Sequence, residues 1–155
     1  MNNLKLVKTK LGKAVYANKK FEKGEEIIEF KGELIEYDNL PKKVDHYIQI
    51  GKTLNMGPSG DFDDFINHSC NPNCGLIVND TKVTLIAITQ IRKDEEISFD
   101  YSTTMDEDDW EMDCLCEDKE CRKRIRDFKY LPKEVQDKYI KLGIVPKFII
   151  ESIKR

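Results

Sequence analysis

No apolar run in the sequence approaches the length of a membrane-spanning helix, which is about 20 residues. Residues 1–10 also lack the apolar block of a secretory signal. We therefore expect no membrane partner and an intracellular protein. In a reducing compartment, cysteines serve as free thiols or metal ligands more often than as disulfides.

The sequence also lacks an excess of positive charge. Its net charge of −3 argues against a duplex-binding domain, whose surface is basic, but leaves a basic peptide open as partner. It shows neither an internal repeat nor a low-complexity linker. With 155 residues, of which 39% are hydrophobic and 35% charged, the chain is expected to form one globular domain.

Histidine is scarce, with two residues, and no nucleophile motif is present, so no catalytic triad is expected. Cysteine occurs five times, an odd number. Three of these residues, Cys114, Cys116 and Cys121, form a Cys-x-Cys-x4-Cys array. This spacing favours thiolates on a metal ion over buried free thiols.

Most of the chain reads as short strands separated by turn residues. Segments with strand character lie near residues 4–8, 14–17, 26–30, 33–35, 47–50, 53–55, 76–78, 83–88 and 97–99. Asn79-Asp80 is the expected hairpin turn between two of them. Many short strands with few helices predict a mostly-β domain built from small sheets.

The last 25 residues are predicted to be helical, unlike the strand-rich part before them. Pro132 marks the first turn of a helix that is expected to end at Gly143, and Pro146 begins a second, shorter helix. Apolar residues such as Tyr139 recur at helical spacing. We interpret this tail as a cap on an apolar face; closure over a substrate groove is the alternative.

One stretch combines several reactive residue types. Residues 65–74 read Phe-Ile-Asn-His-Ser-Cys-Asn-Pro-Asn-Cys. They are too rich in Asn, Ser and Pro for a core strand or helix, and predict a tight turn anchored by Phe65 and Ile66. Such a turn presents amides, an imidazole and thiols from a fixed backbone.

This stretch resembles the Asn-His-Ser-Cys-x-Pro-Asn signature of the SET-domain protein lysine methyltransferases. Two later stretches match the family in the same order: Glu-Glu-Ile-Ser-Phe-Asp-Tyr at residues 95–101, and Cys-Leu-Cys at 114–116 followed by Cys121. The resemblance runs from about Leu4 to Cys121. It implies a mostly-β, β-clip-like SET fold of several small sheets with a knot-like centre, followed by a short helical tail.

The resemblance also implies a division of the chain. We expect the SET domain over residues 1–104 and an acidic loop with a zinc-binding post-SET segment over 105–125. The helical tail, residues 126–155, is expected to pack on the same domain.

By resemblance, the activity is transfer of a methyl group from S-adenosylmethionine to a lysine of a basic protein or peptide, such as a histone tail. Tyr101 is the expected catalytic residue, because its hydroxyl can orient both the methyl group and the amine. Phe30 and Phe99 are expected to line the lysine channel. A Phe at these positions leaves more room than a Tyr, so di- or trimethylation is expected.

The resemblance assigns the cofactor residues as well. Asn67 and His68 are expected to hold S-adenosylmethionine, and Tyr47 to line its pocket. Gly12-Lys13-Ala14 stands where the family carries Gly-x-Gly. The alternatives are that His68 only bonds its own loop and that Tyr47 is an ordinary strand aromatic.

The resemblance supplies the fourth zinc ligand. Cys70 is expected to join Cys114, Cys116 and Cys121 in a closed structural site, with Cys74 as the alternative for the same position. Zinc would then fasten the post-SET segment to the loop that carries Asn67 and His68.

Several residues depart from the family pattern: Ala14, Phe30, Asp64 in place of a common arginine, and Glu117 in place of a common glycine. The first three favour a rival hypothesis, a non-catalytic SET-like module that is stabilised by zinc and binds a peptide or protein.

The acidic run at residues 106–113 is either a solvated loop or a steering patch for a basic peptide.

Some properties stay open at this level. The compartment is expected to be nuclear or cytoplasmic, with a secreted effector acting in a host nucleus as a further alternative. A monomer and a dimer are both compatible with the sequence. Direct sequence-specific binding of nucleic acid is not expected.

Overall fold

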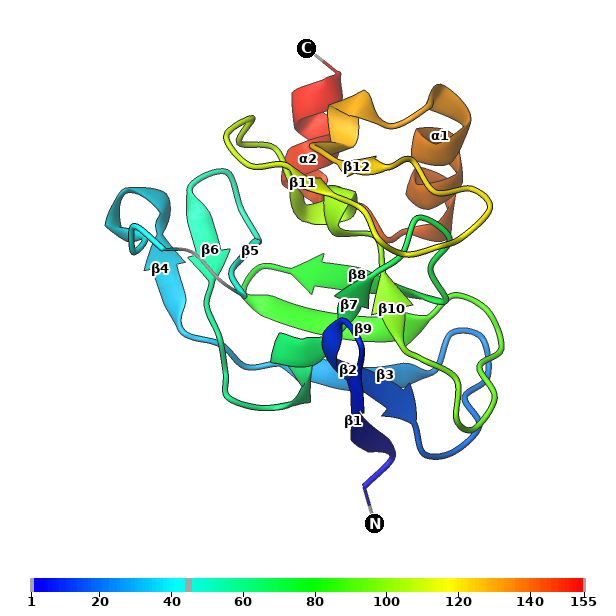
Figure 1. Cartoon of the computed structure of the whole chain (residues 1–155). Coiled ribbons are helices and arrows are strands. Elements are labelled where there is room, and N and C mark those ends of the chain that lie inside the picture. The colour runs from blue at the N-terminus through cyan, green and yellow to red at the C-terminus, as the bar shows by residue number, and fades with distance from the viewer. Residues whose placement is uncertain (1, 44–45, 155) are drawn as a thin grey trace.

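Residues 2–43 and 46–154, which the computed structural model describes, contain twelve short strands and two short α-helices. The strands form five small sheets of two or three strands each. Figure 1 shows the helices gathered at one end of the molecule and the hairpin β1–β2 at the other. The predicted mostly-β fold with a short helical tail is confirmed. Within these ranges, no helix combines the length and the apolar character that crossing a membrane requires.

The central sheet has the strand order β3-β9-β8 and is antiparallel throughout. Its strands are β3 (Glu26–Phe30), β8 (Cys74–Asn79) and β9 (Lys82–Ala87). Leu76 and Leu85 face each other across the β8–β9 pair, and both are fully buried. Asn79 pairs with Lys82, so the hairpin turn comprises Asp80 and Thr81, one residue later than predicted. Asp80 has φ of 53°, a left-handed conformation that Asp tolerates better than most residues.

Three further sheets surround this centre. Two are built from segments expected to be strands: the hairpin of β1 (Leu4–Thr9) with β2 (Gly12–Ala17), and the sheet β4-β6-β5, which consists of Leu34–Glu36, Leu54–Met56 and Ile48–Gln49. The third pairs β11 (Met112–Asp113) with β12 (Arg124–Ile125) and was not expected. Strands of two residues carry no hydrophobic period from which they could be predicted.

The fifth sheet lies near the centre of the molecule, and one of its strands was not expected. Asn67–His68 forms a short strand, β7, which pairs in parallel with β10 (Ser98–Phe99). Figure 1 shows the two strands side by side. The sequence was interpreted as a turn here because its polar residues are poor strand formers, but a parallel partner 31 positions later supplies the backbone hydrogen bonds.

The helical tail packs on the central sheet. Helix α1 (Lys133–Leu142) ends at Gly143, whose φ of 74° is the left-handed conformation expected of a C-terminal cap, and α2 (Lys147–Ile153) follows Pro146. Ile144, in the link between the helices, lies so close to β8 that a Cβ on Gly75 would be 2.4 Å from its side chain. In the part of the chain that the structure describes, four short 3₁₀-helices complete the fold: Tyr37–Asn39 (η1), Phe62–Phe65 (η2), Tyr101–Thr104 (η3) and Phe128–Tyr130 (η4).

Candidate active site and metal centre

The β7–β10 pair brings His68 and Tyr101 together. Phe99 is opposite His68 in the parallel register, and the backbone N–H of Tyr101 donates to His68 Nδ1 over 3.0 Å. The two rings pack edge to face, with centroids 5.3 Å apart. The stretch around Asn67 and the stretch ending at Tyr101, which are remote in sequence, therefore form one structural unit.

The Tyr101 hydroxyl is held by the backbone. It donates a hydrogen bond of 2.7 Å to the carbonyl oxygen of Ile66, the residue just before β7. Burial, and to a lesser extent the Glu96 carboxylate, raises the pKa of Tyr101 above its usual range. The phenol therefore stays protonated at neutral pH and has a fixed direction.

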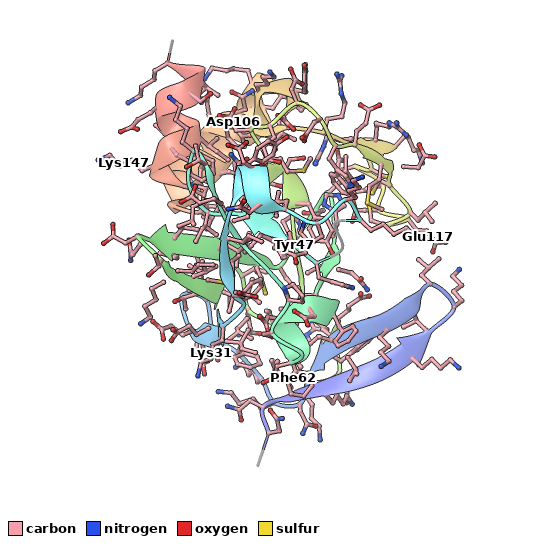
Figure 2. The ribbon with its side chains drawn as sticks, turned by 90° about the vertical axis from the view of Figure 1, so that its left-hand side faces the viewer. Lys31, Tyr47, Phe62, Asp106, Glu117 and Lys147 are labelled. Carbon is pink, nitrogen blue, oxygen red and sulfur yellow. The ribbon has the colours of Figure 1, made fainter. Side chains whose placement is uncertain are left out.

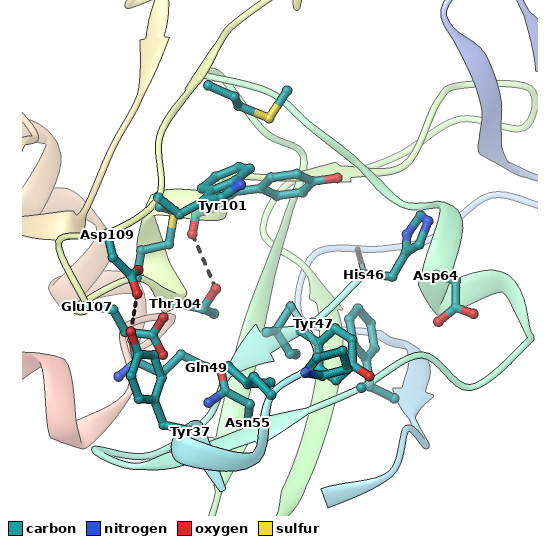
Figure 3. A pocket seen from close by; sticks show the side chains of 18 of the residues that line it. Tyr37, His46, Tyr47, Gln49, Asn55, Asp64, Tyr101, Thr104, Glu107 and Asp109 are labelled. Atoms are coloured by element: carbon teal, nitrogen blue, oxygen red, sulfur yellow. Dashed lines mark hydrogen bonds between the residues drawn. The ribbon is translucent and has the colours of Figure 1, made fainter. Parts of the chain in front are cut away.

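Tyr101 forms part of the wall of a cavity of about 850 Å³. The predicted channel residues Phe30 and Phe99 lie on the same wall. Their rings pack edge to face at 6.3 Å, and the Phe99 and Tyr101 rings are 5.0 Å apart. Tyr47 also lines this cavity, and its ring lies against Gly57, where a Cβ would be 2.9 Å away. Figure 3 shows Tyr47 and Tyr101 on opposite sides of the space.

Asn67, in β7, contacts the predicted cofactor residues at the start of β2. The Asn67 amide donates to the Lys13 carbonyl over 3.4 Å and to the Glu96 carboxylate over 3.1 Å. Gly12 begins strand β2 with φ of 112°, and Ala14 is fully buried two residues later. The structure thus brings Lys13, between Gly12 and Ala14, next to Asn67, while Tyr47 lies on the cavity wall that also carries the predicted channel residues.

Four of the five cysteines form a cluster. The sulfur atoms of Cys70, Cys114, Cys116 and Cys121 all lie within 4.8 Å of one another, and those of Cys70 and Cys114 are 3.7 Å apart. In a tetrahedral zinc–thiolate site, bond lengths of about 2.3 Å place neighbouring sulfurs about 3.8 Å apart. The four predicted ligands therefore fit a structural zinc ion. Cys74 lies outside the cluster, buried in the main core, where its thiol donates to Asn73 Oδ1.

Burial opposes ionisation of the clustered thiols, and backbone N–H donors partly offset it. The backbone N–H groups of Arg122 and Lys123 donate to the sulfurs of Cys70 and Cys121, each over 3.4 Å. Burial raises the pKa of Cys70 to about 11. Burial opposes ionisation of Cys116 too, but backbone N–H donors and the neighbouring thiols outweigh it and lower the pKa of Cys116 to about 7. A divalent cation would stabilise all four thiolates.

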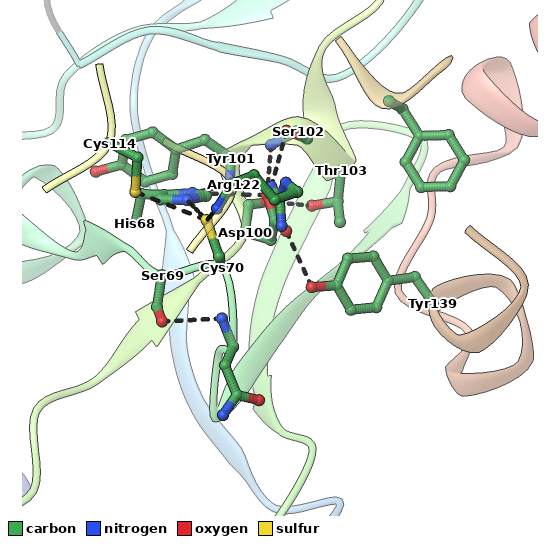
Figure 4. Close-up of polar contacts among 12 residues, drawn as sticks. His68, Ser69, Cys70, Asp100, Tyr101, Ser102, Thr103, Cys114, Arg122 and Tyr139 are labelled. Carbon is green, nitrogen blue, oxygen red and sulfur yellow. Dashed lines mark hydrogen bonds and ion pairs between the residues drawn. The ribbon is translucent and has the colours of Figure 1, made fainter. Parts of the chain in front are cut away.

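A buried carboxylate links the metal centre to Tyr101. Asp100 is 1% exposed and accepts hydrogen bonds from the Ser102 N–H, from Arg122 Nη2 and from the Tyr139 hydroxyl, over 2.8 to 3.0 Å. Figure 4 shows Arg122 and Tyr139 converging on it from the post-SET segment and from helix α1. Sequence reasoning missed this network: Tyr139 was read only as part of an apolar stripe.

His68 lies between this network and the cysteines. Burial lowers its pKa to about 4, although Asp100 opposes the shift, so the imidazole is neutral near pH 7. Its Nδ1 accepts from Tyr101, so the proton is assigned to Nε2, which lies 3.3 Å from Cys70 Sγ. The 3.6 Å contact between His68 Nδ1 and Asp100 is therefore not an ion pair.

Residues 12–102, more than half of the chain, match the model of the family described as the SET domain. The chain belongs to the SET-domain family. Three curated relatives of this SET domain are histone-lysine N-methyltransferases: trr of Drosophila melanogaster (29% identical over 138 residues), 2D of Homo sapiens (30% over 142) and ASHH3 of Arabidopsis thaliana (28% over 159). The matches cover 79%, 79% and 92% of this chain, but only 6%, 2% and 43% of the relatives.

Solved SET-domain structures share the fold. Kryptonite in complex with mCHG DNA and SAH has a TM-score of 0.68 and 25% identity, over 79% of this chain and 29% of that chain. The ctPRC2 complex in an autoinhibited conformation, bound to S-adenosylmethionine, has a TM-score of 0.57 and 25% identity, over 67% of this chain and 16% of that chain.

Two of the departures from the family pattern have a structural explanation in this SET domain. The Asp64 carboxylate accepts the backbone N–H groups of Ser59 and Gly60, over 2.9 and 2.7 Å, and so folds the loop before η2. Glu117 has φ of 59°, a conformation that favours glycine. Figure 2 shows Glu117 facing the tip of the β1–β2 hairpin, where its carboxylate pairs with Lys10 over 3.2 Å.

Proposed function

We propose that this SET domain is a protein-lysine N-methyltransferase that uses S-adenosylmethionine and acts on a basic protein such as a histone tail. The observation that carries the proposal is the fixed Tyr101 hydroxyl on an aromatic cavity wall, directly beside the Asn67–His68 strand. The names of the relatives support the histone tail as substrate.

The reaction is a displacement at carbon. S-adenosylmethionine, when bound, would supply the methyl group on its sulfonium, and the neutral amine of the substrate lysine would accept it. A lysine with pKa near 10.4 is almost fully protonated at pH 7, so the site must favour the neutral amine. The Phe30, Phe99 and Tyr47 rings exclude water from the approach, and the proton leaves to solvent before transfer.

The remaining contribution is positioning. The Ile66 carbonyl directs the Tyr101 hydroxyl, and the Tyr101 N–H is bound to neutral His68. A group held in this way can orient an attacking amine without itself changing protonation state. Asn67 and the start of β2 would hold S-adenosylmethionine. Zinc on Cys70, Cys114, Cys116 and Cys121 would have a structural role, because four thiolates leave no open position.

Phenylalanine at positions 30 and 99 supports di- or trimethylation. Both rings are buried and pack on each other, and neither carries a hydroxyl that could hold a water molecule or the amine. Mass spectrometry of a reacted peptide should show dimethyl or trimethyl lysine. Monomethyl lysine as the final product would contradict this part of the proposal.

The test of the function is incubation with labelled S-adenosylmethionine and a panel of core histones and basic peptides. We expect label on lysine with the wild-type protein, and loss of at least about a hundredfold in kcat with Tyr101→Phe, while binding of S-adenosylmethionine is retained.

A second candidate function is a SET-like module that binds a peptide without methyl transfer. It is favoured by the buried Ala14 where the family has glycine. Calorimetry separates the two functions: the module binds a basic peptide but not S-adenosylmethionine, whereas the enzyme binds both.

A further inference from the structure

One end of the cavity is acidic. Among the residues that line it, one carries an ammonium group, Lys42, and six carry carboxylates: Asp38, Asp63, Asp64, Glu107, Asp109 and Asp127. The carboxylates of Asp63 and Asp64 already accept hydrogen bonds from Ser59 and Gly60. Glu107, Asp109 and Asp127 form the acidic end. Figure 3 shows Glu107 and Asp109 beside Tyr37 and away from the Tyr47 side of the cavity.

These carboxylates lack a cationic partner. Within residues 2–43 and 46–154, no lysine or arginine nitrogen lies within 4.0 Å of a carboxylate oxygen of Glu107, Asp109 or Asp127. The nearby basic residues are paired elsewhere: Arg126 with Glu111, and Lys129 with Asp108. Burial, followed by repulsion from Asp109, raises the pKa of Glu107 to about 7, and burial also raises the pKa of Asp127. Uncompensated negative charge of this kind favours a cationic ligand.

A second observation concerns Asn55, which also lines the cavity and is 3% exposed. Its amide nitrogen finds no hydrogen-bond partner among the described residues. It lies near enough to Glu107 to favour the ionised carboxylate but does not meet hydrogen-bond geometry with it. A buried N–H donor without an acceptor is unfavourable, and points to an acceptor on a ligand. Figure 3 shows Asn55 next to Gln49 at the acidic end.

A peptide supplies both missing partners at once, a cation on a side chain and an acceptor on a backbone carbonyl. We propose that the acidic end binds a second cationic side chain of the substrate, an arginine close in sequence to the methylated lysine. This inference rests on the proposed function, because it assumes that the substrate lysine occupies the aromatic part of the same cavity.

Arginine fits this end better than lysine. Glu107 and Asp109 are close enough to interact directly, so a planar guanidinium can bridge the two carboxylates. The aromatic side chains of Tyr37 and Trp110 also line the cavity, and both are partly exposed, at 38% and 43%. Guanidinium groups stack on such rings more readily than ammonium groups.

The test uses synthetic peptides with one lysine in a neutral host sequence and one arginine placed in turn at each nearby position. A matched set carries citrulline, a neutral residue of nearly the same shape, in place of arginine. For the wild-type protein we expect arginine at one favoured position to raise kcat/KM over citrulline by about tenfold to a hundredfold, mainly through KM.

Substitutions in the protein test which carboxylates cause the difference between the two peptides. Glu107→Gln and Asp109→Asn should remove most of the difference between the arginine and citrulline peptides. Glu111→Gln is the matched control, because Glu111 is the same residue type in the same acidic run but does not line this cavity. The control should keep the difference.

Two results overturn the subsite: equal kcat/KM for the arginine and citrulline peptides, or a loss with Glu111→Gln as large as with Glu107→Gln, which would indicate general electrostatic steering. If no peptide is methylated, the proposed function fails. Calorimetry of the same peptides on the wild-type protein saturated with S-adenosylhomocysteine then decides the subsite separately. Tighter binding of the arginine peptide supports it, and equal binding refutes it.

Discussion

The hydroxyl of Tyr139, on helix α1, donates a hydrogen bond of 2.9 Å to the carboxylate of Asp100, the residue that precedes Tyr101. Both residues are 1% exposed. Arg122, next to Cys121 of the cysteine cluster, binds the same carboxylate over 2.8 Å. A single buried anion therefore ties the helical tail and the post-SET segment to the backbone that presents Tyr101.

Loss of the Tyr139 hydroxyl should weaken the attachment of helix α1 to Asp100. We expect Tyr139→Phe to lower the free energy of unfolding by about 1–2 kcal/mol, because Asp100 loses one charge-assisted hydrogen bond but keeps the other two. Equilibrium urea unfolding measures the change. Tyr130→Phe is the control: its hydroxyl binds the exposed Asp108, so its loss should cost much less than loss of the Tyr139 hydroxyl. Equal losses in both variants would rule out a special role for the buried contact.

The metal centre makes a second prediction. The purified protein should contain one zinc ion, and Cys116→Ser should lose it together with several degrees of thermal stability. Cys74→Ala should keep the metal, because Cys74 lies in the main core and outside the cluster. Elemental analysis and thermal unfolding with and without a chelator measure both effects. Loss of zinc from Cys74→Ala with retention in Cys116→Ser would reverse the ligand assignment.

The cluster of cysteines could be anticipated because ligand spacing is a local property, and three of the four ligands lie within eight residues. Helix α1 and its end were predictable for the same reason, since Pro132 and Gly143 act through their own backbone conformations. Asp100, Arg122 and Tyr139 could not be connected, because nothing in their neighbouring residues specifies a partner 22 or 39 positions away.

The shortest strands could not be predicted because their pairing partners, rather than their own sequences, determine them. Asn67–His68 and Met112–Asp113 become strands through partners elsewhere in the chain, not through their own propensity. Tyr47 belongs to a similar case. It was expected in a strand over residues 47–50, but β5 comprises only Ile48–Gln49 and Tyr47 lies just before it. Its position on the cavity wall depends on Gly57, which lets its ring approach the backbone.

The contact between the tail and the central sheet gives a third prediction. A methyl group on Gly75 would lie 2.4 to 2.9 Å from Ile144, which is fully buried. We expect Gly75→Ala to destabilise the protein by about 1–3 kcal/mol through overpacking.

The matched control for Gly75→Ala is Gly51→Ala. A methyl group on Gly51 would make an ordinary contact of 3.4 Å with Leu54, so its effect should be small. Urea unfolding of both variants provides the comparison. A neutral Gly75→Ala would show that the link between the two helices yields easily, and that the tail is less firmly seated on β8 than its burial indicates.

The last prediction concerns pH. Burial, with Asp109 as the next cause, raises the pKa of Glu107 from an ordinary 4.5 to about 7. Between these values the folded protein holds a proton that the unfolded chain releases, so the free energy of unfolding falls as pH rises from about 4.5 to 7. Glutamine does not titrate. Glu107→Gln should therefore lack this decline and be more stable than the wild type at pH 8, on the order of 1 kcal/mol after allowance for solvent screening.

The comparison isolates Glu107, because its titratable neighbours Asp109 and Asp127 are present in both proteins. Urea unfolding at a series of pH values from 4 to 8 measures the two curves. Glu111→Gln should instead be less stable than the wild type at neutral pH. Hydrogen bonds from Arg124 lower the pKa of Glu111, so the wild-type carboxylate stabilises the fold at neutral pH and loses that contribution in acid. Parallel curves for the wild type and Glu107→Gln would mean that this carboxylate is solvated, and would remove the electrostatic basis for a cation at the acidic end.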